Sequence, residues 1–303
     1  TATNIFEVQG DIARTISDAL HAELSPAEQK VIEAVPTRNT AALENYLLGV
    51  QLKNRHSYAS LEEAKPYLRE ATRLDPEFAE AWVALADTFA SQANTGAISS
   101  KEYLDGARAA VAAALEYGSE LPEAHTQQAM LLWTERDKAG AERAFRRALE
   151  IDPRKTMSLD SYGFYLRSTN RLEDARAVLE QSLDTNPLST ETLFQLGKVE
   201  MYLGDASKNL SRAARILEID PSSAYAATSY LQAYLWMGRY DLSWKWFLKS
   251  FEKDPNDFEN WAHLALHSEE LGYPDLADRY LAKALELGPN APAVLKCQVI
   301  ILF

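Results

Sequence analysis

The chain has 303 residues, with 44 acidic and 31 basic side chains and a formal net charge of −13 at pH 7. A chain of this charge repels nucleic acid and acidic membranes on average, so neither is expected as a partner. Cys297 is the only cysteine, which excludes an intrachain disulfide and a cluster of cysteine metal ligands. No stretch approaches the ~18 apolar residues of a membrane span, and the first residues lack a signal-peptide pattern.

The ends of the sequence suggest a segment of a longer protein. It starts at Thr1 without a methionine and stops on the apolar run from Val299 to Phe303. We expect the segment in the cytoplasm, or in the periplasm if a membrane span precedes Thr1. A solenoid normally ends on a polar face, so the apolar run predicts either a homodimer through the C-terminal end or a fragile last helix.

The first predicted element is an amphipathic helix over residues 4–24. Its apolar residues recur at helical spacing: Ile5, Val8, Ile12, Ile16 and Leu20. We assign residues 1–39 to an N-terminal helical segment and linker, and residues 40–303 to a second region with a different organisation.

That second region repeats. Prolines follow one another at intervals of 34 residues: Pro153, Pro187, Pro221, Pro255 and Pro289. Each closes a predicted helix, because proline cannot continue one. Within the units apolar residues fall at i, i+3, i+4 and i+7, which predicts two amphipathic helices per unit, and glycines such as Gly204, Gly238 and Gly272 mark the turn between them.

The proline spacing places the units along the chain. They begin near Ala42, Ala79, Pro122, Thr156, Thr190, Ala224 and Phe258, and Pro292 opens an incomplete eighth. The second unit is nine residues too long, and segment 91–100, rich in Ser, Asn and Gly, is expected to hold the surplus as a loop. In the fifth unit Asn209 occupies a small-residue position, so we expect either a shift of register towards Leu210 or a bend.

A 34-residue helix–turn–helix unit with this Trp/Leu/Gly/Ala placement and a terminal proline resembles the tetratricopeptide repeat over about residues 40–303. The resemblance implies an all-α fold, namely a right-handed α-solenoid of about seven units and a partial eighth. It also implies a scaffold that binds proteins or peptides. No glycine-rich phosphate loop, nucleophile motif or metalloprotease motif is present in the sequence, so we expect no enzyme and no cofactor.

In proteins that the chain resembles, ligands lie in a concave groove lined by the first helix of each unit, at its second, fifth, ninth, twelfth and thirteenth places. Carried onto this sequence, these places form an apolar, aromatic and methionine-rich floor: Met130, Met157, Phe164, Arg167, Phe194, Lys198, Met201, Tyr202, Tyr225, Gln232 and Trp236. Acidic residues stand towards its ends: Glu80, Asp87, Glu259 and Glu269. The expected partner is therefore an apolar segment with basic flanks. The Lys and Asn set that clamps a free C-terminal carboxylate is missing.

Two other patterns have both a functional and a packing interpretation. His263 and His267 are four residues apart, the spacing of a pair of metal ligands, but they flank core positions of the repeat, and we expect no metal. The aromatic and basic run 243–247 suits nucleic acid, but Phe247 falls on a core position, and the overall charge favours packing.

The N-terminal phrase from Ile5 to Arg14 resembles the join that follows a TolB-like module in bacterial multidomain regulators and cyclases. On that basis we predict the recognition part of a larger bacterial signalling protein. A helix that merely caps the first repeat is the other interpretation of this phrase. Two alternatives for the whole chain are a self-associating structural solenoid and an accessory module that binds a small ligand such as a sugar or lipid.

Overall fold

The computed structural model describes residues 36–55, 58–94, 97–221, 223–251, 258–270, 272–289 and 291–302, together with Asp11, Ile12, Thr15 and Ala19. The secondary structure of these residues is helical, and they include no strand, so the fold is all-α. Except for those four isolated residues, the helix expected over residues 4–24 lies outside the described part of the chain.

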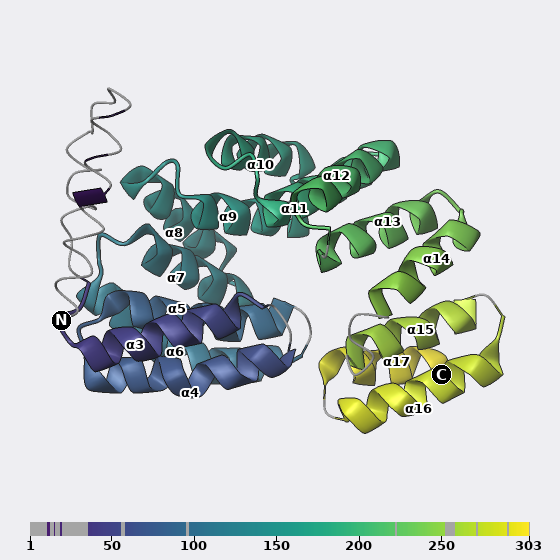
Figure 1. The fold of residues 1–303 in the computed structure, drawn as a ribbon, viewed down its shortest axis with the longest axis horizontal. Helices are drawn as coiled ribbons and strands as arrows, with labels where there is room; N and C mark the ends of the chain where they lie inside the picture. The colour runs from purple at the N-terminus through teal and green to yellow at the C-terminus, as the bar shows by residue number, and fades with distance from the viewer. Residues whose placement is uncertain are drawn as a thin grey trace. The chain divides into compact units, whose positions relative to one another are not determined.

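The chain divides into two compact parts (Figure 1). The N-terminal part, residues 1–92 and 101–119, holds α3 (Thr40–Lys53), α4 (Tyr58–Leu74), most of α5 (Ala79–Asn94) and α6 (Ser100–Tyr117).

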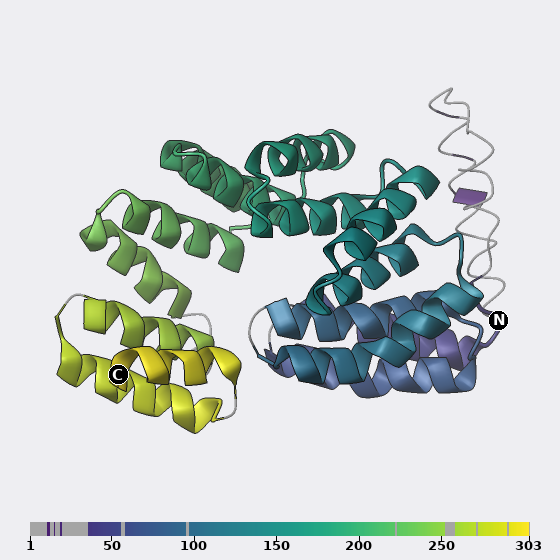
Figure 2. The ribbon, with the colours of Figure 1, turned by 180° about the vertical axis from the view of Figure 1, so that it is seen from behind.

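The C-terminal part, residues 93–100 and 120–303, holds the remaining helices: α7 (Pro122–Thr134), α8 (Lys138–Ile151), α9 (Thr156–Ser168), α10 (Leu172–Thr185), α11 (Thr190–Tyr202), α12 (Ala206–Ile219), α13 (Ala224–Trp236), α14 (Tyr240–Phe251), α15 (Phe258–Glu270), α16 (Pro274–Leu287) and α17 (Pro292–Leu302). The first helices α7, α9, α11, α13 and α15 each pack against the second helix of the same repeat, and α17 packs against α15 and α16 (Figures 1 and 2).

The first helices begin where the sequence spacing places them. All predicted starts from Ala79 to Pro292 coincide with observed ones, and α3 begins at Thr40, two residues before Ala42. The expected loop over residues 91–100 is wrong in its first part, because α5 continues to Asn94. Gln92 extends its buried face: the side chain is 0% exposed and donates a hydrogen bond to Glu62 at 2.6 Å.

The turns inside the repeats share one backbone conformation. Arg136, Asn170, Gly204, Gly238 and Gly272 are spaced by 34 residues, and all have a positive φ between 60° and 97°. Such a conformation costs little for glycine but about 1–2 kcal/mol for a residue with a Cβ. The three glycines therefore match their turns, whereas Arg136 and Asn170 adopt the same turn at a cost.

Helix α12 keeps the register of the other repeats, and the expected shift towards Leu210 does not occur. Asn209 and Ile216 are fully buried, whereas Leu210 and Leu217 are only partly buried. The amide fits because Gly197 of α11 lies opposite: a Cβ there would come within 2.4 Å of Asn209 Oδ1. A small residue on one helix thus accommodates the unusual side chain on the other.

Candidate binding surface on the first helices

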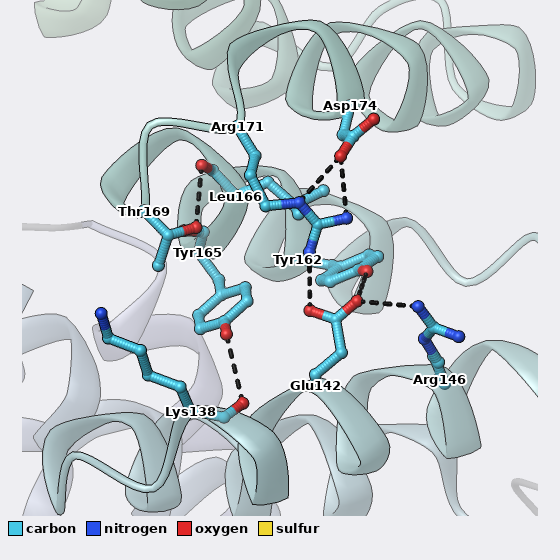
Figure 3. Close-up of polar contacts among 9 residues, drawn as sticks. All are labelled: Lys138, Glu142, Arg146, Tyr162, Tyr165, Leu166, Thr169, Arg171 and Asp174. Atoms are coloured by element: carbon cyan, nitrogen blue, oxygen red, sulfur yellow. Dashed lines mark hydrogen bonds and ion pairs between the residues drawn. The ribbon is translucent and has the colours of Figure 1, made fainter.

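Helix α9 is held firmly against its neighbours, which fixes the surface that it presents elsewhere (Figure 3). Tyr162 on α9 donates a hydrogen bond to Glu142 Oε1 of α8 at 2.6 Å. Arg146 and Arg171 donate to the same carboxylate at 3.1 and 3.0 Å. Arg171 also binds Asp174 at the start of α10, at 2.8 Å. A single carboxylate therefore ties α8, α9 and the turn into α10 together.

The electrostatics of this network follow from burial and these hydrogen bonds. Burial by itself would raise the pKa of Glu142, but the hydrogen bonds from Tyr162, Arg171 and Arg146 together lower it below its usual value. Burial, with the hydrogen bond to Glu142, raises the pKa of Tyr162 to about 12. Glu142 is therefore ionised and Tyr162 protonated at neutral pH.

Aromatic contacts on another side join α7 to α9 and α11 to α13, two pairs among the first helices of four successive repeats. Between α7 and α9, the rings of Trp133 and Phe164 meet edge to face with centroids 5.5 Å apart. Two more contacts join α11 to α13: Phe194 stacks on Tyr225 at 4.8 Å, and Tyr202 meets Trp236 edge to face at 5.8 Å. We call the residues at the predicted groove places on α7, α9, α11 and α13 the first-helix surface.

The structure separates the predicted site residues by exposure. Seven are partly buried: Met157, Phe164, Arg167, Phe194, Lys198, Tyr225 and Gln232. Tyr202 and Trp236 are exposed, at 42% and 56%. Met130 and Met201 are wrongly placed on the floor, because they are only 5% and 3% exposed. Met130 belongs to the hydrophobic core around Phe145 and Leu166, so neither thioether can serve as a contact for a partner.

Two cations lie among these rings. The Arg167 Cζ atom stands 5.0 Å from the centroid of Phe164 and 5.9 Å from that of Tyr202, so this guanidinium links α9 to α11. The Lys198 Nζ atom stands 4.7 Å from the centroid of Phe194. Burial lowers the pKa of both groups, that of Lys198 to about 8 with a further contribution from the charge of Arg167.

Sequence reasoning missed Asp160, which takes the fifth place of α9. Its carboxylate accepts a hydrogen bond from Thr192 of α11 at 2.9 Å, and burial raises its pKa. The repeat register itself could have found this residue, because the fifth place is one of the groove places. Asp160 acts on Tyr225, whose pKa is raised by burial and by the charges of Glu191 and Asp160.

The four acidic residues predicted at the ends of the groove differ in pairing and exposure. Asp87 forms an ion pair with Lys53 of α3, so its charge is already balanced within the N-terminal part. Glu80 is partly buried, the side chain of Glu259 lies outside the described set, and Glu269 is exposed. Of these four acidic residues, Glu269 is therefore the one whose side chain is described as exposed.

Of the two competing patterns, the structure describes side chains of only one, the aromatic run. The side chains of His263 and His267 lie outside the described set, and the described residues contain no group of three or more His, Cys, Asp or Glu side chains that could hold a metal. In the aromatic run, Trp246 stacks on Tyr230 of α13 at 4.0 Å and Ser243 donates to a backbone oxygen of that helix. This run is therefore part of the packing between α13 and α14.

Comparison with known proteins agrees with the helix pattern. Two family models described as tetratricopeptide repeat match residues 60–97 and 122–155. The chain carries tetratricopeptide repeats. Its helical repeats are those of an all-α solenoid. No described helix combines the length and hydropathy that a membrane span requires.

The curated relatives are distant and much longer. Anaphase-promoting complex subunit 3 of Schizosaccharomyces pombe is 22% identical over 53% of this chain and 24% of its own length. Protein bimA of Emericella nidulans is 21% identical over 59% of this chain and 21% of its own. The chain thus spans about a quarter of the length of the curated relatives it matches. The TolB-like join is not supported by any comparison.

Two solved structures show the same fold at low sequence identity. A monomeric mutant of IFIT1, solved with m7Gppp-AAAA, has a TM-score of 0.71 and 15% identity, over 95% of this chain and 65% of that one. A tetratricopeptide repeat protein from Parabacteroides merdae has a TM-score of 0.58 and 14% identity, over 87% of this chain and 99% of that one. At such identities the likeness concerns the fold alone.

Proposed function

We propose that this chain is a scaffold that holds a peptide segment of a partner protein on the first-helix surface, and that it catalyses no reaction. Tetratricopeptide-repeat proteins are generally protein-interaction scaffolds, which supports the general class. The observation that carries the specific proposal is the row of rings from Trp133 on α7 to Trp236 on α13, in which Arg167 bridges Phe164 of α9 and Tyr202 of α11. Exposed and partly exposed aromatic side chains in one row are typical of contact sites.

The chemistry of this row suits an apolar or aromatic segment. Tyr202 and Trp236 offer large rings that lose little conformational entropy on binding. Gln232 on α13 has a buried Oε1 atom without a hydrogen-bond donor, and a peptide N–H would satisfy it. A basic residue of the partner would find Glu269 on α15.

Our proposal for the cellular role and compartment of the chain rests on its sequence. We propose that the chain is the recognition part of a larger signalling protein, from the resemblance of its N-terminal phrase to bacterial regulators, and that it works in the cytoplasm. The curated relative from Schizosaccharomyces pombe is by its name a subunit of a complex, which supports an assembly role for such repeats.

The test is to truncate the exposed ring of the row. An immobilised protein is incubated with a pool of end-capped random peptides, and the retained peptides are quantified by mass spectrometry. Trp236→Ala should reduce retention by about tenfold or more, since a well-packed aromatic anchor contributes about 2 kcal/mol. Tyr273→Ala is the matched control, because Tyr273 is 57% exposed but precedes α16, away from the row. Undiminished retention by Trp236→Ala, with loss on Leu248→Ala of α14, would place binding on the second helices.

A second candidate function is self-association through α17. Leu295, Val299 and Ile300 are 41%, 59% and 52% exposed on this helix, an apolar face that a second copy could cover. Sedimentation over a wide concentration range should show a dimer for the parent and a monomer for Val299→Lys. A parent that stays monomeric at every concentration would exclude this function.

A further inference from the structure

Among the residues that the structure describes, the two cations of the first-helix surface have no ion-pair partner. Arg167 has a buried Nε atom without a hydrogen-bond acceptor. Arg167 lies against the rings of Phe164 and Tyr202 and also interacts with the Tyr202 hydroxyl, and Lys198 lies against the ring of Phe194. Among the described residues, neither cation reaches a carboxylate within ion-pair distance. Two positive charges therefore act on each other across α9 and α11.

This arrangement is an exception within the chain. Other shielded cations have partners: Arg212 binds Glu200 at 2.9 Å, Lys65 binds Glu62 at 2.6 Å, and Lys53 and Lys155 each pair with an acid. The sequence has 44 acidic residues against 31 basic ones, so acids are not scarce. Burying a charge without a partner costs free energy, and perturbed unpaired groups of this type gather at functional sites.

We infer that Arg167 and Lys198 form a preformed site for one acidic side chain, Asp or Glu, within the partner segment that lies on the first-helix surface. The inference rests on the proposed function and names the chemistry of its ligand. It also replaces the expectation of a purely apolar centre, because the acid would sit between the rings of Phe164, Phe194 and Tyr202.

The occupant is a side-chain carboxylate for two reasons. The ring row continues on both sides of the cations, towards Trp133 and towards Trp236, so the bound segment passes through the site instead of ending there. Arginine pairs well with a planar carboxylate, and one negative charge is repelled less than a phosphate by a chain of net charge −13.

The titration of Lys198 supports this reading. Burial and the charge of Arg167 lower its pKa to about 8, so an acid bound beside it should raise that pKa again. Arg167 on α9 is the charge that acts on it. The other charged groups on these helices include Asp160 of α9, which accepts a hydrogen bond from Thr192, and Glu191 of α11, which is exposed. Glu200 of α11 binds Arg212 of α12. Helix α13 contributes Tyr225 and Gln232 to this surface, and both are uncharged at neutral pH.

The experiment compares end-capped peptide pools that differ only at a fixed central residue, which is Glu, Gln or phosphoserine, between degenerate aromatic and aliphatic positions. Capping removes the terminal carboxylate. Each pool is titrated against the parent and against Arg167→Gln and Lys198→Met. The controls are Arg143→Gln and Lys245→Met, which remove exposed charges from the second helices α8 and α14.

We expect the parent to prefer the Glu pool over the Gln pool by about tenfold, because a charge-assisted hydrogen bond contributes that much. Both site variants should lose the preference, and both controls should keep it. For the parent the preference should decline as the pH rises above 8, where Lys198 loses its charge.

The contrary results are distinct. Equal retention of the Glu and Gln pools by the parent, with both lost on Trp236→Ala, would overturn the acidic site and leave peptide binding intact. A Glu preference that survives in Arg167→Gln and Lys198→Met would place the site elsewhere. Stronger retention of the phosphoserine pool would overturn the carboxylate. Retention of no pool would overturn this inference and the proposed function together.

Discussion

Arg167 and Arg171 are four residues apart, yet the chain treats their charges in opposite ways. Arg171 follows α9 and binds Asp174 and Glu142, and these hydrogen bonds raise its pKa. Arg167 faces the rings of the first-helix surface, where burial lowers its pKa. The contrast teaches that this chain supplies its own acids where helices of neighbouring repeats must hold together. Beside Arg167, on the surface where we propose that a partner binds, no described acid lies within ion-pair distance.

The largest expected effect comes from breaking the network around Glu142, to which Arg171 belongs. Glu142→Ala leaves Tyr162, Arg146 and Arg171 without their common acceptor, in a place where the Glu142 side chain is 18% exposed. We expect a loss of about 2–3 kcal/mol in the free energy of unfolding, measured by urea titration. Glu173→Ala is the control: its 64% exposed carboxylate pairs with Arg176 alone, and its loss should cost under about 0.5 kcal/mol. Equal costs for the two variants would show that the network is unimportant.

The same network predicts a dependence on pH. The folded-state pKa of Glu142 is lowered, so its contribution to stability is present above the unfolded pKa and is lost as the pH falls through the folded one. The difference in stability between the parent and Glu142→Gln should therefore shrink as the pH falls from about 5 to about 3. A difference that stays constant over this interval would mean that ionisation of Glu142 does not matter.

The comparison also depends on the repeat register, which Ala148→Leu tests. Ala148 on α8 is fully buried where helices cross, so a larger side chain should overpack the site and cost about 1–3 kcal/mol. Thermal unfolding gives the check. Ala139→Leu, at the exposed start of the same helix, should leave the midpoint close to that of the parent. A parental midpoint for Ala148→Leu would contradict the close crossing.

Beside Arg167, where the cations lack a described acid within ion-pair distance, a substitution should stabilise the protein. Lys198→Met removes a buried charge beside Arg167 and keeps an apolar side chain of similar length, so we expect a gain on the order of 1 kcal/mol near pH 7. The folded-state pKa of Lys198 is depressed, so the parent gains stability as the pH rises from about 8 towards 10, and the advantage of the variant should fade there. Destabilisation by Lys198→Met at pH 7 would show that the lysine has a structural role and would weaken the contrast.

The smallest expected change in stability concerns the turns between the two helices of each repeat. Arg136→Gly should raise the free energy of unfolding by under about 1 kcal/mol, because glycine removes the strain of a φ of 67° but gains freedom in the unfolded chain. Asn170→Gly should gain less, since asparagine tolerates this conformation better. A loss of stability in Arg136→Gly would mean that the arginine side chain contributes more than the strain costs.

The site could be predicted from the sequence in part. The repeat register found the partly buried rings, such as Phe164 and Phe194, and both cations. It put Met130 and Met201 on the surface because a place in a helix does not tell how far the next repeat covers it. It also treated Asp87 as a free acid, since the ion pair with Lys53 joins α3 to α5 across 34 residues of sequence.

The sequence by itself determined the helices and their order. Proline spacing, apolar periodicity and turn glycines are local signals, and in a repeat protein most contacts are made between neighbours, so local signals fix most of the fold. Tertiary structure alone decided which charges meet. Asn209 keeps its register because Gly197 lies opposite, and Arg171 has acids beside it while Arg167 has rings. Those outcomes depend on distances between side chains of different helices, and spacing along one chain carries no information about them.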